Sequence, residues 1–320
     1  MRRKTLAAAQ AAATIVLLLL LFRGFDWGAF RALYLRLPLW FYAGSLAAIV
    51  TGPVLYAWRW RVLLVCGGIH LPFAHVLQQY LVGIFVNNFL PSTIGGDAAK
   101  AFYVGRQHGY TAVTTSLILD RVLGVGLLSL LAAAALWAER HADPAYVTVR
   151  LVLSGIAGSF VVAMAVALAG AGSLRRRLER AGGRTAGLAP HLQRFSADLA
   201  RAVRSPAVWL QSAATIAAYF VLMTFVYQGF IALQSGQAPG FVAVMMAVAS
   251  AAVLTNIPIT VNGLGLREQL HVLLLTPLGV PKEAAVAISL LLFGHVLLVS
   301  VAGGLVWWRL SRGPARVVEA

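Results

Sequence analysis

Six long runs of predominantly apolar residues dominate this chain. They cover about 5–22, 38–58, 112–137, 146–170, 207–233 and 284–308. A helix needs about 20 mostly apolar residues to cross the hydrocarbon core of a bilayer. Hydrophobic residues make up 60% of the chain and charged residues only 11%, whereas soluble domains typically carry about 25% charged residues. The pattern predicts an all-α fold, a polytopic membrane helix bundle that forms one integral membrane domain over 1–320 and has no soluble catalytic domain.

Basic residues gather in the segments between and beside the apolar runs. The formal net charge of +16 alone would suit a nucleic-acid-binding protein, but eight arginines lie in a single connecting segment, 172–206. Cytoplasmic segments of membrane proteins are enriched in Lys and Arg. We therefore expect a basic cytoplasmic loop at 172–206 and no nucleic-acid partner. Basic residues also precede the first run and follow the last, which predicts that both termini are cytoplasmic.

One connecting segment disagrees with this orientation. The 23–37 segment contains Arg23, Arg31 and Arg36 against a single acidic residue, Asp26. It follows the first crossing and should therefore face away from the cytoplasm, where an excess of arginine is unusual. The segment stands as an objection to the predicted topology.

Two further apolar stretches, 70–105 and 239–280, are interrupted by asparagine, proline and glycine. The first interruption reads Asn87-Asn88-Phe89-Leu90-Pro91-Ser92-Thr93-Ile94-Gly95-Gly96-Asp97. The second reads Asn256-Ile257-Pro258-Ile259-Thr260-Val261-Asn262-Gly263-Leu264-Gly265-Leu266-Arg267-Glu268. Each runs from asparagine through proline and a hydroxyl residue to a pair of glycines and a charged residue, and one lies in each half of the chain.

These interruptions predict broken helices. Proline removes a backbone donor and glycine permits unusual backbone angles. The backbone groups that are freed are tolerated in a membrane only where they are buried in protein or line a wet cavity. Both termini lie on one side if each interrupted stretch leaves and returns at the same face. We therefore expect six spans and two re-entrant broken hairpins, entering from opposite faces, which gives eight or more membrane segments in pseudo-symmetric inverted halves. Two full crossings in each stretch, up to ten in all, are the alternative.

Acidic and basic residues lie close together in these regions. The pairs are Asp97 with Lys100, Asp120 with Arg121, and Glu268 with Arg267. Ionisable groups within membrane segments are rare and usually face the bundle interior or a cavity. Two interpretations are open: the pairs clamp the helices together, or the three bases face a polar cavity and attract an anionic headgroup.

The candidate substrate-binding residues are those of the two interruptions and the charged pairs. They are Asn87, Asn88, Pro91, Ser92, Thr93, Gly95, Gly96, Asp97, Lys100, Asp120, Arg121, Asn256, Pro258, Asn262, Gly263, Gly265, Arg267 and Glu268. A helix that begins after a glycine pair points free N–H groups and the positive end of its dipole outward, which favours an anion such as phosphate.

Motifs of enzymes are absent from the sequence. It contains no metal-binding histidine motif, no phosphate-binding loop and no nucleophile motif. We therefore expect no enzymatic activity, no cofactor and no metal. His271 lies in an apolar segment and is interpreted as a hydrogen-bonded packing residue.

The order of three motifs resembles a known membrane family. They are Asn88-Phe89-Leu90-Pro91 with Gly95-Gly96-Asp97, then Asp120-Arg121 with Gly124, then Asn262-Gly263-Leu264-Gly265-Leu266-Arg267-Glu268. Together they resemble the flippase-like membrane proteins, which include the N-terminal transmembrane region of bacterial lysylphosphatidylglycerol synthases. The resemblance covers nearly the whole chain. Lys100 stands where an arginine is common in that family, and Ser92 and Thr93 where small residues or glycine are common.

The resemblance implies a helical domain with two re-entrant segments that handles lipids in the cytoplasmic membrane of a bacterium or archaeon. The lysyl transfer of the synthases belongs to a separate C-terminal domain, and this chain ends at Ala320 without it, so that activity is not expected. The expected function is translocation of an anionic or aminoacylated phospholipid, or of a polyprenyl-phosphate glycolipid. The alternative is a non-transporting partner or regulator of a lipid- or glycolipid-modifying enzyme. The sequence does not indicate an oligomeric state.

Overall fold

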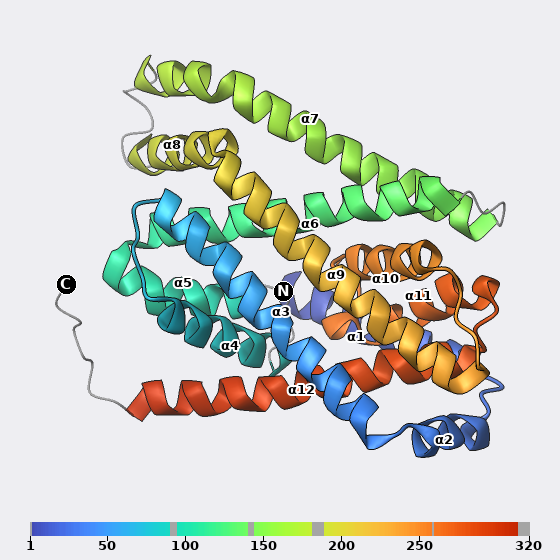
Figure 1. Cartoon of the computed structure of the whole chain (residues 1–320). Helices are drawn as coiled ribbons and strands as arrows, with labels where there is room; N and C mark the ends of the chain where they lie inside the picture. Colours follow the sequence, from blue (N-terminus) through green and yellow to red (C-terminus); the bar gives the residue numbers. More distant parts are fainter. Residues whose placement is uncertain (1, 90–94, 140–143, 181–188, 258, 313–320) are drawn as a thin grey trace.

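The structure, a computed structural model, describes all residues except 1, 90–94, 140–143, 181–188, 258 and 313–320. In these described ranges the chain forms twelve α-helices and two 3₁₀ turns, and no strand occurs. Figure 1 shows the helices gathered in one bundle, with the long helices running roughly along a common direction. The predicted all-α helix bundle is confirmed.

The six predicted apolar runs all form helices. These are α1 (Arg2–Phe22), α3 (Leu39–Cys66), α6 (Tyr110–Glu139), α7 (Pro144–Arg180), α9 (Pro206–Ser235) and α12 (Lys282–Arg312). In the last five, a window of the helix is long and apolar enough to cross a bilayer alone, and α1 adds a sixth candidate when it is taken with the helix that follows it.

The two interrupted stretches form pairs of shorter helices, as the breaks predict. The first pair is α4 (Phe73–Phe89) and α5 (Gly95–His108), and the second is α10 (Phe241–Thr255) and α11 (Leu266–Leu275), with the 3₁₀ turns η1 (Val261–Gly263) and η2 (Thr276–Leu278) before and after α11. The longest of these helices has 17 residues, which corresponds to about 25 Å, less than the roughly 30 Å of a hydrocarbon core. The two stretches are therefore each broken into short helices, and whether they form re-entrant hairpins or full crossings stays a prediction.

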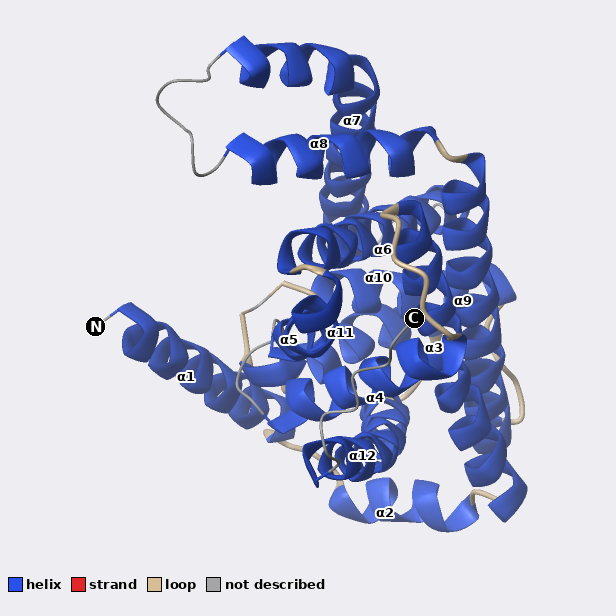
Figure 2. Ribbon diagram, turned by 90° about the vertical axis from the view of Figure 1, so that its left-hand side faces the viewer, coloured by secondary structure: helices blue, strands red, loops and turns tan. Residues whose placement is uncertain are grey.

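Helices occur in two segments for which the sequence predicted only connections between spans. The 23–37 segment forms α2 (Trp27–Arg36), which is bent by 87° from α1. The 172–206 segment is largely helical, because α7 continues to Arg180 and α8 covers Ala189–Arg204. Figure 1 shows α2 and α8 at opposite ends of the bundle, and Figure 2 shows α1 along one side with its N-terminal end pointing away from the other helices.

The core of the bundle surrounds α10. Ten of its 15 residues are buried, and the main hydrophobic cluster around it also takes side chains from α3, α6, α7, α9, α11 and α12. Such a short helix that is apolar on every side is stable only inside protein or lipid. Its central place means that the second break, which follows Thr255 at the end of α10, opens into the middle of the bundle.

Close packing between two helices requires a glycine at position 303. Gly303 on α12 lies so near the backbone carbonyl of Leu81 on α4 that an added Cβ would approach the oxygen to within 3.0 Å, a distance real Cβ atoms essentially never show. Only a residue without a side chain permits this contact. The carbonyl belongs to a helix backbone, so it has little freedom to move away.

We expect Gly303→Ala to separate α12 from α4 and to lower the stability of the purified protein in detergent by about 1–3 kcal/mol, the usual effect of overpacking. The measurement is the midpoint of thermal unfolding followed by tryptophan fluorescence. Gly294→Ala, on the same helix with nothing within 4 Å of the added atom, serves as the control and should leave the midpoint unchanged. Equal midpoints for both variants would contradict the contact.

Candidate functional site

The first break is held by asparagine and glycine. Asn87, near the end of α4, accepts a hydrogen bond from the backbone N–H of Gly96 through its Oδ1 atom at 2.6 Å. A Cβ on Gly96 would collide with the backbone oxygen of Gly83, so the start of α5 packs directly on α4. Gly95 opens α5. The predicted site residues Pro91, Ser92 and Thr93 lie outside the described residues.

The second break uses left-handed backbone. Asn262, at φ 51° and ψ 29°, and the glycines Gly263 and Gly265, at φ 74° and 79°, turn the chain between α10 and α11. The carboxylate of Glu268 accepts a hydrogen bond from the Gly265 N–H at 2.7 Å and so satisfies one of the free donors at the start of α11. Asn256 caps the end of α10. Pro258 lies outside the described residues.

The two breaks are in direct contact. The side-chain amide of Asn262 donates a hydrogen bond to Oδ1 of Asn88 at 2.8 Å, across 174 residues of sequence. Helix α1 also contacts the second break, because Oγ1 of Thr14 accepts a hydrogen bond from the Val261 N–H at 3.0 Å. The interrupted segments from the two halves of the chain therefore form one polar centre in the bundle.

The ion pairs at this centre differ from those that sequence proximity predicts. Asp97 pairs with Lys100 at 2.8 Å and also with Arg121. Asp120 pairs with Arg59 of α3 at 2.7 Å, and both side chains are only 7% exposed. Successive helix residues point about 100° apart, so Asp120 and Arg121 face different neighbours. The predicted pairing of Asp120 with Arg121 is wrong, and Arg59, which is not among the candidate residues, is part of the site.

The third pair is as predicted, and it continues into a hydrogen-bonded chain. Arg267 donates from Nε to Oε1 of Glu268 at 2.9 Å. His271, one turn further along α11, donates from Nδ1 to the carbonyl oxygen of Arg267 at 2.7 Å, so its Nε2 accepts from the hydroxyl of Tyr227 at 2.5 Å. The spacing of four residues between Arg267 and His271 could have indicated this link. Nothing in the sequence points to Tyr227.

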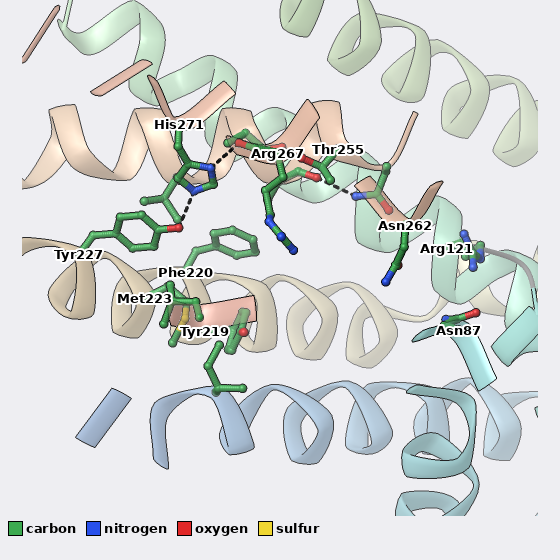
Figure 3. A pocket seen from close by; sticks show the side chains of 16 residues that line it. Asn87, Arg121, Tyr219, Phe220, Met223, Tyr227, Thr255, Asn262, Arg267 and His271 are labelled. Carbon is green, nitrogen blue, oxygen red and sulfur yellow. Dashed lines mark hydrogen bonds between the residues drawn. The ribbon is translucent and has the colours of Figure 1, made fainter. Parts of the chain in front are cut away.

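A cavity of about 380 Å³ opens between the second break and α9 (Figure 3). Its walls combine polar groups from the breaks with apolar side chains from the core. They are Ile49, Asn87, Arg121, Tyr219, Phe220, Met223, Tyr227, Val248, Ala251, Ala252, Thr255, Asn256, Asn262, Arg267, His271 and Leu292. Figure 3 shows Arg267 extending from α11 into this space, with Asn262 beside it and Arg121 farther along.

A second cavity of about 250 Å³ adjoins the first and is more polar. Its walls are Tyr56, Arg59, Tyr80, Gly83, Ile84, Asn87, Asp97, Lys100, Asp120, Arg121, Gly124, Val125, Leu128, Ile216, Phe220 and Asn256. Four residues line both cavities: Asn87, Arg121, Phe220 and Asn256. Along α3 the lining passes from Ile49 in the first cavity to Arg59 in the second, which is about 15 Å of helix. The two cavities are therefore stacked along the bundle.

Among the described residues around the two cavities, basic side chains outnumber acidic ones by one. Four bases, Arg59, Lys100, Arg121 and Arg267, face three acids, Asp97, Asp120 and Glu268. Asp97 is shared by two of the bases, and of these the Arg121 side chain is 42% exposed whereas the Lys100 side chain is 7% exposed. Arg121 is therefore the more accessible of these two bases, and it lies on the wall common to both cavities. Such a site attracts an anion.

In the described part of the chain, no group of three or more His, Cys, Asp or Glu side chains is placed to hold a metal ion. The ammonium group of Lys100 lies 4.4 Å from the ring centre of Tyr80 and 5.3 Å from that of Trp60, so aromatic faces and Asp97 fix its position.

The buried Arg59–Asp120 pair generates a stability prediction. Removal of one partner leaves an uncompensated charge in an apolar setting, so we expect Asp120→Asn to destabilise the protein by about 3–5 kcal/mol. The double variant Arg59→Met with Asp120→Leu should recover much of this loss, because neither charge then remains. Thermal unfolding of Arg59→Met, of Asp120→Leu and of the double variant measures the coupling between the two side chains. Additive losses would show that the two side chains do not depend on each other.

Comparisons with known proteins place the chain. The family model for the lysylphosphatidylglycerol synthase transmembrane region matches residues 6–304. One similar curated protein is the UPF0104 membrane protein PH1989 of Pyrococcus horikoshii, 28% identical over 97 residues. That segment spans 29% of this chain and 29% of the relative's own length. No solved structure matches the chain significantly. Since the family model covers nearly all of its residues, the chain belongs to the lysylphosphatidylglycerol synthase transmembrane-region family, a family of multi-pass membrane proteins.

Proposed function

We propose that this protein moves a phosphate-bearing lipid between the two leaflets of the cytoplasmic membrane, without enzymatic chemistry of its own. The observation that carries the proposal is the pair of stacked cavities joined at Arg121. A polar headgroup crosses hydrocarbon slowly because its hydrogen bonds to water are lost there. A polar path inside the protein replaces those bonds.

The chemistry of the walls supports an anionic headgroup. A guanidinium offers charge-assisted and often bidentate hydrogen bonds to phosphate. Arg267 in the first cavity and Arg121 on the shared wall are two such groups, and Lys100 adds a third cation in the second cavity. Arg267 also lies with its guanidinium carbon 4.2 Å from the ring centre of Phe293, which holds it in place.

The same walls suit a lipid better than a free ion. Apolar side chains such as Phe220, Met223 and Leu292 line the first cavity beside the polar groups, so a glycerol backbone and the first carbons of an acyl or prenyl chain find apolar contacts there. The proposed substrate class is an anionic or aminoacylated phospholipid, or a polyprenyl-phosphate glycolipid. Asp97 and Asp120, on the walls of the second cavity, would contact a cationic group of an aminoacylated lipid.

We propose the orientation that the charges predict, with both termini and α8 on the cytoplasmic side. The second cavity then lies in the cytoplasmic half of the bundle and the first cavity in the opposite half. A lipid that passes from one cavity to the other would pass Arg121.

The test is a leaflet-exchange assay with purified protein in vesicles that contain a fluorescent phosphatidylglycerol. The wild-type protein should expose inner-leaflet dye to an external quencher faster than protein-free vesicles do. Arg121→Gln keeps Asp97 paired with Lys100 but removes one charged contact to phosphate, worth about 1.5–3 kcal/mol, so exchange should slow by roughly tenfold or more.

The matched control is Arg309→Gln, which removes the same charge from an exposed position near the end of α12, outside both cavities. It should leave the exchange rate unchanged. Equal rates in vesicles with and without wild-type protein would rule out translocation. If phosphatidylglycerol still co-purified with the protein in that case, the result would favour a lipid-binding partner or regulator of another membrane enzyme.

A further inference from the structure

Helix α2 has a composition that neither water nor hydrocarbon accommodates well. Trp27, Arg31 and Leu35 follow one another at intervals of four residues, which places them on one face of the helix. All three are exposed, Trp27 to 57% and Leu35 to 74%. An arginine in hydrocarbon is costly, and exposed tryptophan and leucine are unfavourable in water. The headgroup region of a bilayer accepts both kinds of side chain.

The opposite face of α2 is fixed to the bundle. Phe30, Leu33 and Tyr34 pack against the main hydrophobic core. The Tyr34 hydroxyl donates to the carbonyl oxygen of Ala287 on α12 at 2.8 Å, and the side-chain amide of Gln234 on α9 donates to the Leu33 carbonyl at 3.0 Å. The helix therefore presents its other face outward in a defined direction.

The bend of 87° between α1 and α2 sets the orientation of α2 relative to α1. If α1 crosses the membrane, a helix at nearly a right angle to it lies parallel to the membrane plane. Asp26 begins α2 by accepting a hydrogen bond from the Ala29 N–H at 2.9 Å. The ring of Trp27 stacks on that of Phe22 at the end of α1, with ring centres 4.9 Å apart. This aromatic junction is typical of the boundary between hydrocarbon and headgroups.

Positive charge is concentrated at the same place. Arg23, Arg31 and Arg36 are exposed, and the Lys282 ammonium donates to the Arg23 carbonyl oxygen at 3.4 Å. In the described chain, Asp26 and Glu283 are the acidic residues next to these bases in sequence, so four bases stand against two acids in these two segments. Asp26 is engaged at the start of α2. A net positive surface at headgroup depth fits lipid phosphates.

We propose that α2 is an interfacial helix that lies in the leaflet at the end of the bundle opposite α8, where Arg31 and Arg36 bind the phosphates of anionic lipids. The partner is the lipid surface itself, so the inference does not depend on translocation. It also explains why the 23–37 segment carries three arginines although the predicted topology places this segment away from the cytoplasm. The enrichment of Lys and Arg in cytoplasmic segments concerns charges in free loops, whereas these arginines would be bound to lipid phosphate.

The depth of α2 can be measured with a spin label. Leu35→Cys in a Cys66→Ala background, which removes the only native cysteine, carries the label in nanodiscs of phosphatidylglycerol. Oxygen should relax the label more strongly than a water-soluble nickel chelate does. A label at Gln237, an exposed residue of the 236–240 link at the same end, is the control and should be accessible to the chelate. Equal accessibility of both labels to the chelate would overturn the proposal.

The role of the arginines needs a second measurement. Spin-labelled phosphatidylglycerol should be enriched over spin-labelled phosphatidylcholine in the lipid shell of the wild-type protein. Each basic residue at an anionic surface contributes about fivefold in affinity, so Arg31→Gln with Arg36→Gln should markedly reduce the enrichment. Arg106→Gln, an exposed position on α5 at the other end, controls for loss of net charge. An unchanged enrichment in the double variant would overturn phosphate binding by α2 even if the helix lies at the predicted depth.

Discussion

The backbone groups that the two helix breaks release must find partners inside the protein, because lipid offers none. Asn87 accepts from the Gly96 N–H, and Glu268 accepts from the Gly265 N–H. Thr14 of α1 does the same for Val261. Each break is thus stabilised by a polar side chain that must itself be buried. Polar and charged residues occupy the centre of an otherwise apolar bundle for this reason.

That requirement explains how the charges are arranged. A carboxylate that is buried to satisfy a backbone donor needs a cation beside it, and Glu268 has Arg267. In the first half, Asp97 accepts from both Lys100 and Arg121, so the bases outnumber the acids by one. The sequence left two roles open for the ion pairs, holding the helices together or attracting an anion, and this arrangement permits both. The same ion pairs that fix the helices leave Arg121 partly exposed on the shared cavity wall.

Several parts of this fold could be predicted from the sequence, because they depend on local patterns. The apolar runs determine the long helices, and proline with glycine predicts both breaks. Asn88 and Asn262 were both candidate site residues, and the structure joins them by a hydrogen bond that the sequence did not predict. Arg59 was missed as a partner of Asp120 because the contact joins residues 61 positions apart. Helix α2 was not predicted because it has only ten residues and its arginines interrupt the apolar pattern.

The wall between the two cavities bears most directly on the proposed transport. It consists of the two asparagines Asn87 and Asn256, the base Arg121 and the aromatic ring of Phe220. The amides and the guanidinium offer hydrogen bonds to a phosphate at the point where it would leave one cavity for the other. Phe220, which is 6% exposed, offers only an apolar surface. A headgroup that keeps its polar contacts through this point avoids most of the desolvation that makes uncatalysed exchange slow. The passage of lipid past Arg121 would then depend more on the movement of Phe220 than on further charge.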